Sequence, residues 1–324
     1  MSDAGPPDDR PEGPDVATEI EGHADVLAYL READGHAFAF VGPSRIGRRT
    51  VALWWARWAT CETVRAQGGD TPCGRCESCR LHAAGRHPDV AVKAPATETK
   101  RGRAALAPML RIDQLVPRDG PSADPDPLAT RIRARPRFGT SFAILDGAET
   151  LNEAAGNAFL KLLEEPPSWA KIVLIAPSVG ALLPTLASRC TPVRFAAPPT
   201  HAAAGDAPHP ALRTGQLGWL RSDAADPEGA AVLRDAADAV VAALPGPLDG
   251  ALTATRAWLD VKRERAPGDA DAWLLEALRR DAPAAYPAAL AAVRDADDAA
   301  RAYVGADVVA ATLALRLRAA VGAA

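Results

Sequence analysis

Residues 36–50 read HAFAFVGPSRIGRRT, an apolar run that leads into a glycine-rich loop and then into a helix-forming segment. The loop keeps Gly42 and Gly47 at the spacing of the phosphate-binding motif, in which a lysine and then a serine or threonine follow the second glycine. Arg48 occupies the lysine position and Arg49 the hydroxyl position. The loop therefore has the scaffold of a nucleotide site without the two side chains that bind phosphate and magnesium.

The order of the predicted elements indicates an α/β fold with a parallel sheet. His36–Val41 predicts a strand, and a helix is expected from Arg48 to about Val64, so the loop lies in the context that a phosphate loop requires. A second strand is expected at Asp89–Lys93, and buried strands are expected at Phe142–Leu145 and Ile172–Ala176. A further helix is expected at Asn152–Glu164. Strands that alternate with helices form parallel sheets covered on both faces.

Composition predicts four segments along the 324-residue chain. Residues 1–19 are acidic and proline-rich, which predicts a disordered tail, and residues 20–198 hold the P-loop-like domain with its cysteine module at 61–79. Beyond them the spacing is helical, with no strand apparent. We expect a small helical unit at 199–238 and a helical bundle at 239–324.

Charge and hydropathy bear on the class of partner. The chain carries 37 Lys and Arg against 41 Asp and Glu, a formal net charge of −4. A protein that binds DNA by itself usually has a basic excess, so autonomous DNA binding is not favoured. The sequence has neither a membrane-length apolar run nor a secretory signal, which predicts a cytoplasmic protein. Residues 117–127 (PRDGPSADPDP) predict a surface loop.

Four of the five cysteines lie close together in the sequence: Cys61, Cys73, Cys76 and Cys79. Thiolates bind zinc tetrahedrally, and such clustering in a cytosolic chain indicates a metal site rather than disulfides. We expect a structural Zn²⁺, with His82 or His87 as the alternative fourth ligand should Cys61 point elsewhere. A redox pair of Cys73 and Cys76 is a second alternative, against which the two further cysteines argue.

Asp146 ends a predicted strand, where nucleotide hydrolases carry an aspartate that steadies magnesium and usually a glutamate after it. Here the next residue is Gly147, and Glu149 would leave the strand in another direction. A metal role and a turn-capping role for Asp146 both stay open. We expect no ATP hydrolysis, although three arginines leave weak anion binding open: Arg45, Arg48 and Arg49.

Several motifs together resemble those of the clamp-loader branch of the AAA+ proteins. Besides the phosphate loop and the cysteines they are GRHPD at 85–89, LRIDQL at 110–115, NAFLKLLEEPP at 157–167 and Ser-Arg-Cys at 188–190. The resemblance covers residues 20–198 well and the later helices in outline. It implies an AAA+ domain, a helical lid at 199–238 and a helical collar at 239–324.

Within that branch the chain resembles a subunit of the bacterial DNA polymerase III clamp loader whose nucleotide site is degraded. The resemblance implies that Arg189, with Ser188 and Cys190 of its motif, acts in trans as an arginine finger in the ATP site of a neighbouring subunit. An ordinary exposed cation is the alternative for Arg189. The degenerate site would comprise Gly42, Gly47, Arg48 and Asp146 and bind no nucleotide. Trp219 stands where active relatives carry a nucleotide-sensing arginine.

The implied partners are gamma/tau-type ATPase subunits and a delta-type subunit in a hetero-pentamer. The sliding clamp and primed DNA would be reached through this complex, without a membrane. Two alternatives remain: an active ATPase of the same branch that uses Arg48 in place of lysine, and a zinc-dependent nucleic-acid-binding module at Cys61–Cys79.

Overall fold

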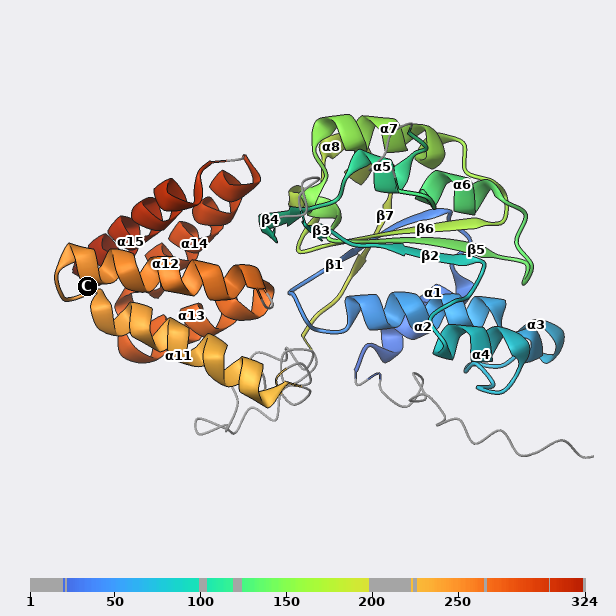
Figure 1. Ribbon diagram of the computed structural model, residues 1–324. Coiled ribbons are helices and arrows are strands. Elements are labelled where there is room, and N and C mark those ends of the chain that lie inside the picture. The colour runs from blue at the N-terminus through green and yellow to red at the C-terminus, as the bar shows by residue number, and fades with distance from the viewer. Residues whose placement is uncertain are drawn as a thin grey trace, which may run out of the picture.

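The computed structural model describes residues 20, 22–98, 104–118, 124–197, 223, 226–264, 267–302 and 304–322. They form an α/β lobe followed by a bundle of helices (Figure 1). The predicted tail at 1–19, Trp219 and most of the segment 199–238 lie outside the described residues. So does the centre of the predicted surface loop, although Asp124 from its end forms an ion pair with Lys93 at 2.8 Å.

A five-stranded parallel sheet forms the centre of the first lobe. Its strands are β1 (Ala37–Val41), β2 (Val90–Lys93), β5 (Ser141–Asp146), β6 (Ala170–Ala176) and β7 (Thr191–Arg194). Their order across the sheet is β2-β5-β6-β1-β7, and every pairing is parallel. β1, β5 and β6 are buried along almost their whole length. The predicted α/β fold with a parallel sheet is confirmed.

Two layers of helices cover the sheet (Figure 1). One layer contains α1 (Ala24–Glu32), α2 (Arg48–Thr60), α3 (Glu62–Gln67) and α4 (Glu77–Ala83), and the other contains α5 (Ile112–Leu115), α6 (Leu128–Arg133), α7 (Glu153–Glu164) and α8 (Pro184–Ala187). Because alternate residues of a strand face opposite sides, Phe38 packs edge-on against Trp55 of α2, with ring centroids 5.0 Å apart. Ala39 lies in the core on the other side, with Phe159 of α7.

The structure differs from the sequence expectation at three places. The helix expected to reach Val64 ends at Thr60, because Cys61 adopts an extended conformation before α3 begins. β7 was not expected, since it is a short edge strand that contains Pro192 and is mostly exposed. An antiparallel hairpin, β3 (Ala96–Glu98) and β4 (Ala104–Met109), was also not expected. Short 3-10 helices η1 (Ala148–Thr150) and η2 (Val179–Ala181) join the remaining elements.

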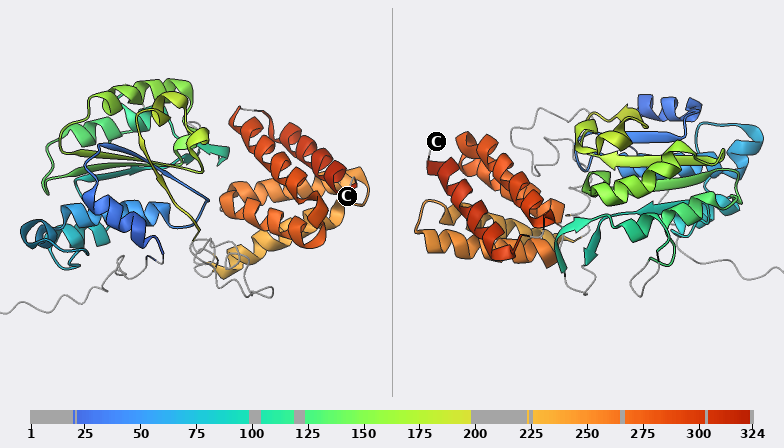
Figure 2. Two further views of the ribbon diagram at one scale, coloured as in Figure 1. Left: turned by 180° about the vertical axis from the view of Figure 1, so that it is seen from behind. Right: turned by 90° about the horizontal axis from the view of Figure 1, so that it is seen from above.

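The described residues of the second lobe form five α-helices: α11 (Pro227–Ala243), α12 (Leu248–Glu264), α13 (Pro267–Asp281), α14 (Tyr286–Arg301) and α15 (Ala306–Gly322), with η3 (Pro283–Ala285) before α14. Figure 2 shows them as one bundle, and β4 of the first lobe contacts α12 and α14. α11 runs unbroken across residue 238, and Leu233 belongs to the bundle core, so the bundle begins before the boundary expected at 239. None of the helices among the described residues is long and apolar enough to cross a membrane.

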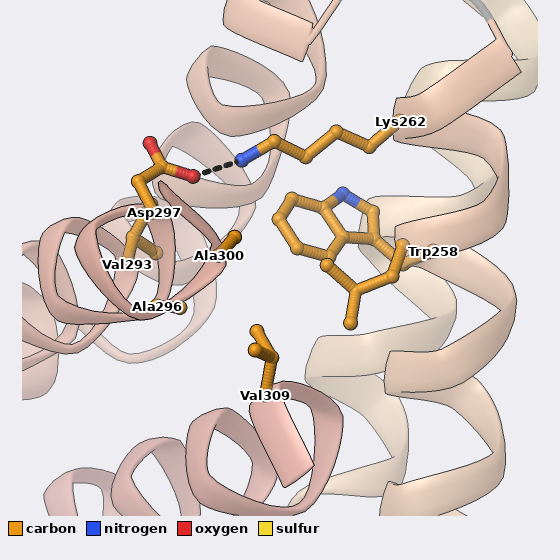
Figure 3. A pocket seen from close by; sticks show the side chains of 8 residues that line it. Trp258, Lys262, Val293, Ala296, Asp297, Ala300 and Val309 are labelled. Carbon is orange, nitrogen blue, oxygen red and sulfur yellow. Dashed lines mark hydrogen bonds and ion pairs between the residues drawn. The ribbon is translucent and has the colours of Figure 1, made fainter. Parts of the chain in front are cut away.

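A buried cation joins three helices of this bundle. Lys262 of α12 is 4% exposed, and its Nζ lies 2.6 Å from Asp271 Oδ1 of α13 and 2.6 Å from Asp297 Oδ1 of α14. Figure 3 shows it beside Trp258, whose ring centroid is 5.2 Å from Nζ, in a small pocket closed by Val293 and other apolar side chains. Burial opposes the charge, but the two carboxylates raise the pKa of Lys262 above its ordinary value. The ionised triad fixes how the three helices pack.

Lys262→Met should destabilise the bundle by about 3 kcal/mol, because breaking a buried ion pair leaves uncompensated charge behind. Asp271 and Asp297 would then face each other without the shared cation. Urea unfolding followed by far-UV circular dichroism measures the loss. Adding Asp271→Asn and Asp297→Asn to the variant should restore most of the stability. A triple variant as unstable as Lys262→Met would mean that packing, and not charge, carries the effect.

Candidate functional site

The glycine-rich loop joins the carboxyl end of β1 to α2. Gly42 and Gly47 have φ angles of +156° and +101°, which favour glycine. A Cβ at Gly42 would collide with the carbonyl oxygen of Phe195, so only glycine allows the close approach of the loop to the chain after β7. The loop thus delivers the first turn of α2 to the carboxyl edge of the sheet, where a phosphate group would bind.

Arg48, at the lysine position of the motif, points into the protein. The residue is 9% exposed, and its Nη1 donates a hydrogen bond to the carbonyl oxygen of Ala176 at the end of β6. Burial lowers the pKa of Arg48, while the nearby carboxylates of Glu149 and Asp146 act in the opposite direction. An arginine in a protein stays protonated, so this guanidinium is a fixed cation held by the strand end.

Arg49, at the hydroxyl position, pairs with the acidic strand end. Its Nη1 lies 3.2 Å from Oδ2 of Asp146, the last residue of β5. The predicted site residues Gly42, Gly47, Arg48 and Asp146 are therefore brought together at one edge of the sheet. In a working site a hydroxyl and this aspartate would hold magnesium, whereas here a guanidinium faces the aspartate directly.

The four cysteine sulfurs of the module gather at one point, all within 4.8 Å of one another. Cys61 follows α2, Cys73 and Cys76 lie on the next loop, and Cys79 lies in α4. Gly74, with φ +75°, permits the turn between the two loop cysteines. Zinc–sulfur bonds of about 2.3 Å place tetrahedral sulfurs about 3.8 Å apart. The 3.9 Å between Cys61 Sγ and Cys76 Sγ agrees with that spacing, so the donor set fits a tetrahedral metal ion.

Backbone amides already point at the sulfurs. Cys61 Sγ accepts from the amide of Cys73 at 3.3 Å, and Cys73 Sγ and Cys76 Sγ accept from the amides three residues further on at 3.4 Å. Although burial acts to raise the pKa of Cys73, hydrogen bonds from Thr63 and the backbone bring it down to about 6. Burial raises the pKa of Cys79 to about 12. Hydrogen bonds thus favour the thiolate form of Cys73, whereas burial disfavours that of Cys79.

His82 and His87, the alternative ligands, are engaged elsewhere, and Cys61 completes the cluster. His82 Nε2 lies 2.9 Å from Thr60 Oγ1, and His87 Nε2 lies 3.1 Å from Ser78 Oγ. The two imidazoles lie against each other, with ring centroids 4.1 Å apart. Burial lowers the pKa of His82 to about 3 and that of His87 to about 4, so both rings are neutral. His82 links α4 to Thr60 of α2, and His87 links the segment after α4 to Ser78 of α4.

Arg189 lies at the amino ends of the parallel strands, whereas the phosphate loop lies at their carboxyl ends. It precedes β7, whose first residue Thr191 pairs with Phe38, whereas the loop begins after Val41. Because strands rise about 3.3 Å per residue, the length of β1 alone separates the amino ends of the strands from their carboxyl ends by about 13 Å. Arg189 therefore cannot serve the phosphate loop of its own chain.

The Arg189 side chain is exposed at the end of α8 and is held in place by α7. Its Nη2 lies 2.7 Å from Glu164 Oε1, and its Nη1 donates to the carbonyl oxygen of Thr185 at 2.9 Å. Ser188 Oγ accepts a longer bond of 3.3 Å from the same nitrogen, and Cys190 is buried in the core. The guanidinium is thus oriented at the surface.

The sequence did not predict two contacts at these sites: that of Arg189 with Glu164 and that of Arg57 with Cys79. Glu164 belongs to the quoted NAFLKLLEEPP stretch, but nothing in the sequence pairs it with Arg189. Arg57 lies beside Cys79, and its position four residues before Cys61 is a signal that could have placed it on the helix face toward the cysteines.

The buried histidine pair should make the stability of the first lobe depend on pH. Both folded-state pKa values lie below the ordinary 6.5, so the unfolded chain binds more protons as the pH falls. Their contribution is therefore complete above pH 6.5 and is lost as the pH falls toward 4, by about 1 kcal/mol per histidine over the first unit. Urea midpoints of the reduced, metal-free chain at pH 6.5 and 5.5 measure this.

The double variant His82→Gln/His87→Gln is the comparison for that measurement. It should lose clearly less stability than the wild type over the same pH interval. Equal losses in the two proteins would show that other groups are responsible.

Comparisons with known proteins support the same reading of these motifs. Residues 29–199 match the family described as DNA polymerase III, delta subunit. DNA polymerase III subunit delta' of Pseudomonas aeruginosa is 35% identical over 160 residues, which are 49% of this chain and 43% of that protein. The delta' subunit of Yersinia pestis is 35% identical over 145 residues, 45% of this chain and 37% of that protein. The chain thus matches less than half the length of these two relatives.

Two further likenesses extend beyond the delta' proteins. DNA polymerase III subunit tau of Salmonella typhimurium is 30% identical over 184 residues, 55% of this chain and 25% of that protein. The crystal structure of a DNA polymerase III gamma subunit-related protein from Thermotoga maritima superposes with a TM-score of 0.46 at 16% identity, covering 94% of this chain and 99% of that one. Because the family match at residues 29–199 covers more than half of the sequence, the chain belongs to the DNA polymerase III delta subunit family, as a clamp-loader subunit of the delta-prime type.

Proposed function

We propose that the chain is a non-hydrolysing subunit of the DNA polymerase III clamp loader. It would assemble with gamma/tau-type ATPase subunits and a delta-type subunit in a hetero-pentamer and support ATP-driven loading of the sliding clamp on primed DNA. The observation that carries the proposal is that Arg48 and Arg49, at the two chemical positions of the phosphate loop, are engaged within the protein itself.

Phosphoryl transfer requires a metal ion that bridges the phosphates and a residue that orients the attacking water. The Arg49 guanidinium lies 3.2 Å from Oδ2 of Asp146, and its charge repels a divalent cation from that carboxylate. Arg48 donates to Ala176 instead of a phosphate. Gly147 follows the aspartate where a glutamate would orient water. These contacts support a site that neither binds nucleotide well nor hydrolyses it.

The placement of Arg189 supports a role in trans. Its guanidinium is exposed on the amino edge of the sheet, away from the phosphate loop of its own chain. An arginine finger supplied by a neighbour stabilises the charge that develops on the transferred phosphoryl group. We propose that Arg189, framed by Ser188 and the buried Cys190, acts in this way on an adjacent ATPase subunit.

The cysteine cluster supports a structural metal ion, and its four thiols favour Zn²⁺. Cys61, Cys73, Cys76 and Cys79 would fill all four positions, so no open position is left for a substrate. A bound ion would supply a cross-link between the end of α2, the cysteine loop and α4. The net charge of −4 favours this structural role over direct DNA binding by the module.

Restoring the phosphate loop should restore nucleotide binding without hydrolysis. The isolated wild-type chain should bind a fluorescent ATP analogue with magnesium at least tenfold more weakly than Arg48→Lys/Arg49→Thr, because the variant frees Asp146 and returns a hydroxyl ligand for the metal. Equilibrium fluorescence titration measures binding, and phosphate release measures turnover. Hydrolysis by the wild type that disappears in Asp146→Asn would instead identify an active ATPase.

Arg189→Ala should lower ATP turnover of the reconstituted clamp-loader complex in the presence of primed DNA and clamp. Loss of an arginine finger lowers kcat at the affected ATP site by a factor of about 10³–10⁵. The ATP turnover of the whole complex should therefore fall by at least the fraction that this site contributes. The effect should appear in kcat with little change in KM for ATP. Size-exclusion chromatography should show that the complex still assembles.

Arg194→Ala is the matched control for that experiment, since Arg194 is also an exposed arginine and is the last residue of β7. Its turnover should equal that of the wild type. Unchanged turnover in Arg189→Ala would leave Arg189 an ordinary surface cation.

A further inference from the structure

A buried arginine lies against the cysteine cluster. Arg57 is in the last turn of α2, four residues before Cys61, and is only 4% exposed. Its guanidinium lies close enough to the Cys79 thiol to favour the thiolate form of that side chain, and its Nη2 lies beside Gly74, 3.7 Å from where a Cβ on that residue would stand. One side chain therefore contacts both α4 and the turn between Cys73 and Cys76.

Charge explains why a cation should be found there. A divalent ion bound by four thiolates carries a net charge of −2, which is costly to bury without compensation. Three backbone amides directed at sulfur supply partial positive charge. Arg57 supplies a full positive charge, and the other arginines of the module, Arg65, Arg75 and Arg80, are all exposed to solvent, which screens their charge.

The chemistry of arginine suits this position. Its planar guanidinium has five N–H donors in a fixed fork, so it can address a sulfur and the neighbouring turn at once. It also stays protonated when buried, so its charge is constant. A residue that lies against a metal ligand in this way holds the ligand in place and tunes the affinity of the site.

We propose that Arg57 is a positioning residue of the metal centre, orienting Cys79 and compensating the negative charge of the metal–thiolate cluster. The inference rests on the proposed metal site. Its consequence is that metal affinity depends on a side chain that does not ligate the ion.

The test compares the reduced, metal-free full-length chain with Arg57→Met, which keeps the length without the charge, and with Arg57→Lys, which keeps the charge. Arg80→Met is the matched control, because Arg80 lies in the same module but is exposed. Co²⁺ titration reports the ligand set and stoichiometry by absorption, and competition between Zn²⁺ and a chromophoric chelator gives the affinity.

We expect one metal ion per wild-type chain with the spectrum of a tetrahedral thiolate site. Arg57→Met should bind about 10- to 100-fold more weakly, Arg57→Lys should recover most of that loss, and Arg80→Met should match the wild type. The sulfur-to-cobalt charge-transfer band of Arg57→Met should move to longer wavelength, because a sulfur without the neighbouring guanidinium holds its electrons less tightly.

Other outcomes separate the two claims. Wild-type protein that binds no metal would remove the proposed metal site itself. Wild-type binding with Arg57→Met within twofold of it, or with Arg57→Lys as weak as Arg57→Met, would overturn the role of Arg57 in charge compensation. If Arg57→Met fails to fold by circular dichroism, the lysine variant carries the test, and a metal affinity in it more than tenfold below that of the wild type would overturn the role of Arg57 in charge compensation.

Discussion

β1 pairs in parallel with both β6 and β7, and this register places the phosphate loop and Arg189 at opposite ends of the strands. The carboxyl ends of the strands bring together the glycine loop, Asp146 and the Ala176 carbonyl group, so Arg48 and Arg49 in the first turn of α2 find their partners within reach. The amino end of β7 places Arg189 on the opposite edge. A register shift of one residue would reverse the faces of β1 and separate Phe38 from Trp55.

The sequence was a good guide to elements whose signal is local. The strands β1, β2, β5 and β6 each have an apolar run, and all were predicted to within two residues at either end. β7 has no such run, because Pro192 and Arg194 flank its one buried side chain, Val193. The break in the helix at Cys61 was missed for a different reason. The sequence there has helical spacing, but the cysteine must turn toward three partners from a later segment.

The candidate sites divide in the same way. Motif spacing identified the loop glycines and the cysteine cluster, because their chemistry depends on neighbours in sequence. The pairs Arg49–Asp146 and Arg189–Glu164 link residues 97 and 25 positions apart, and no local pattern encodes them. Arg57 could be predicted in part: the sequence shows that it lies four residues before Cys61, but it does not show that its side chain is buried.

The ion pair of Arg49 and Asp146 has a thermodynamic consequence. A tethered guanidinium competes for its carboxylate at a constant effective concentration, whereas a diffusible cation must compete at its cellular concentration. A ligand shifts a conformational equilibrium only by its difference in affinity for the two states, and a site filled from within offers no such difference. This lobe would then hold one shape at any ratio of ATP to ADP. If the chain assembles as proposed, this lobe would keep its shape while neighbouring subunits bind and release nucleotide.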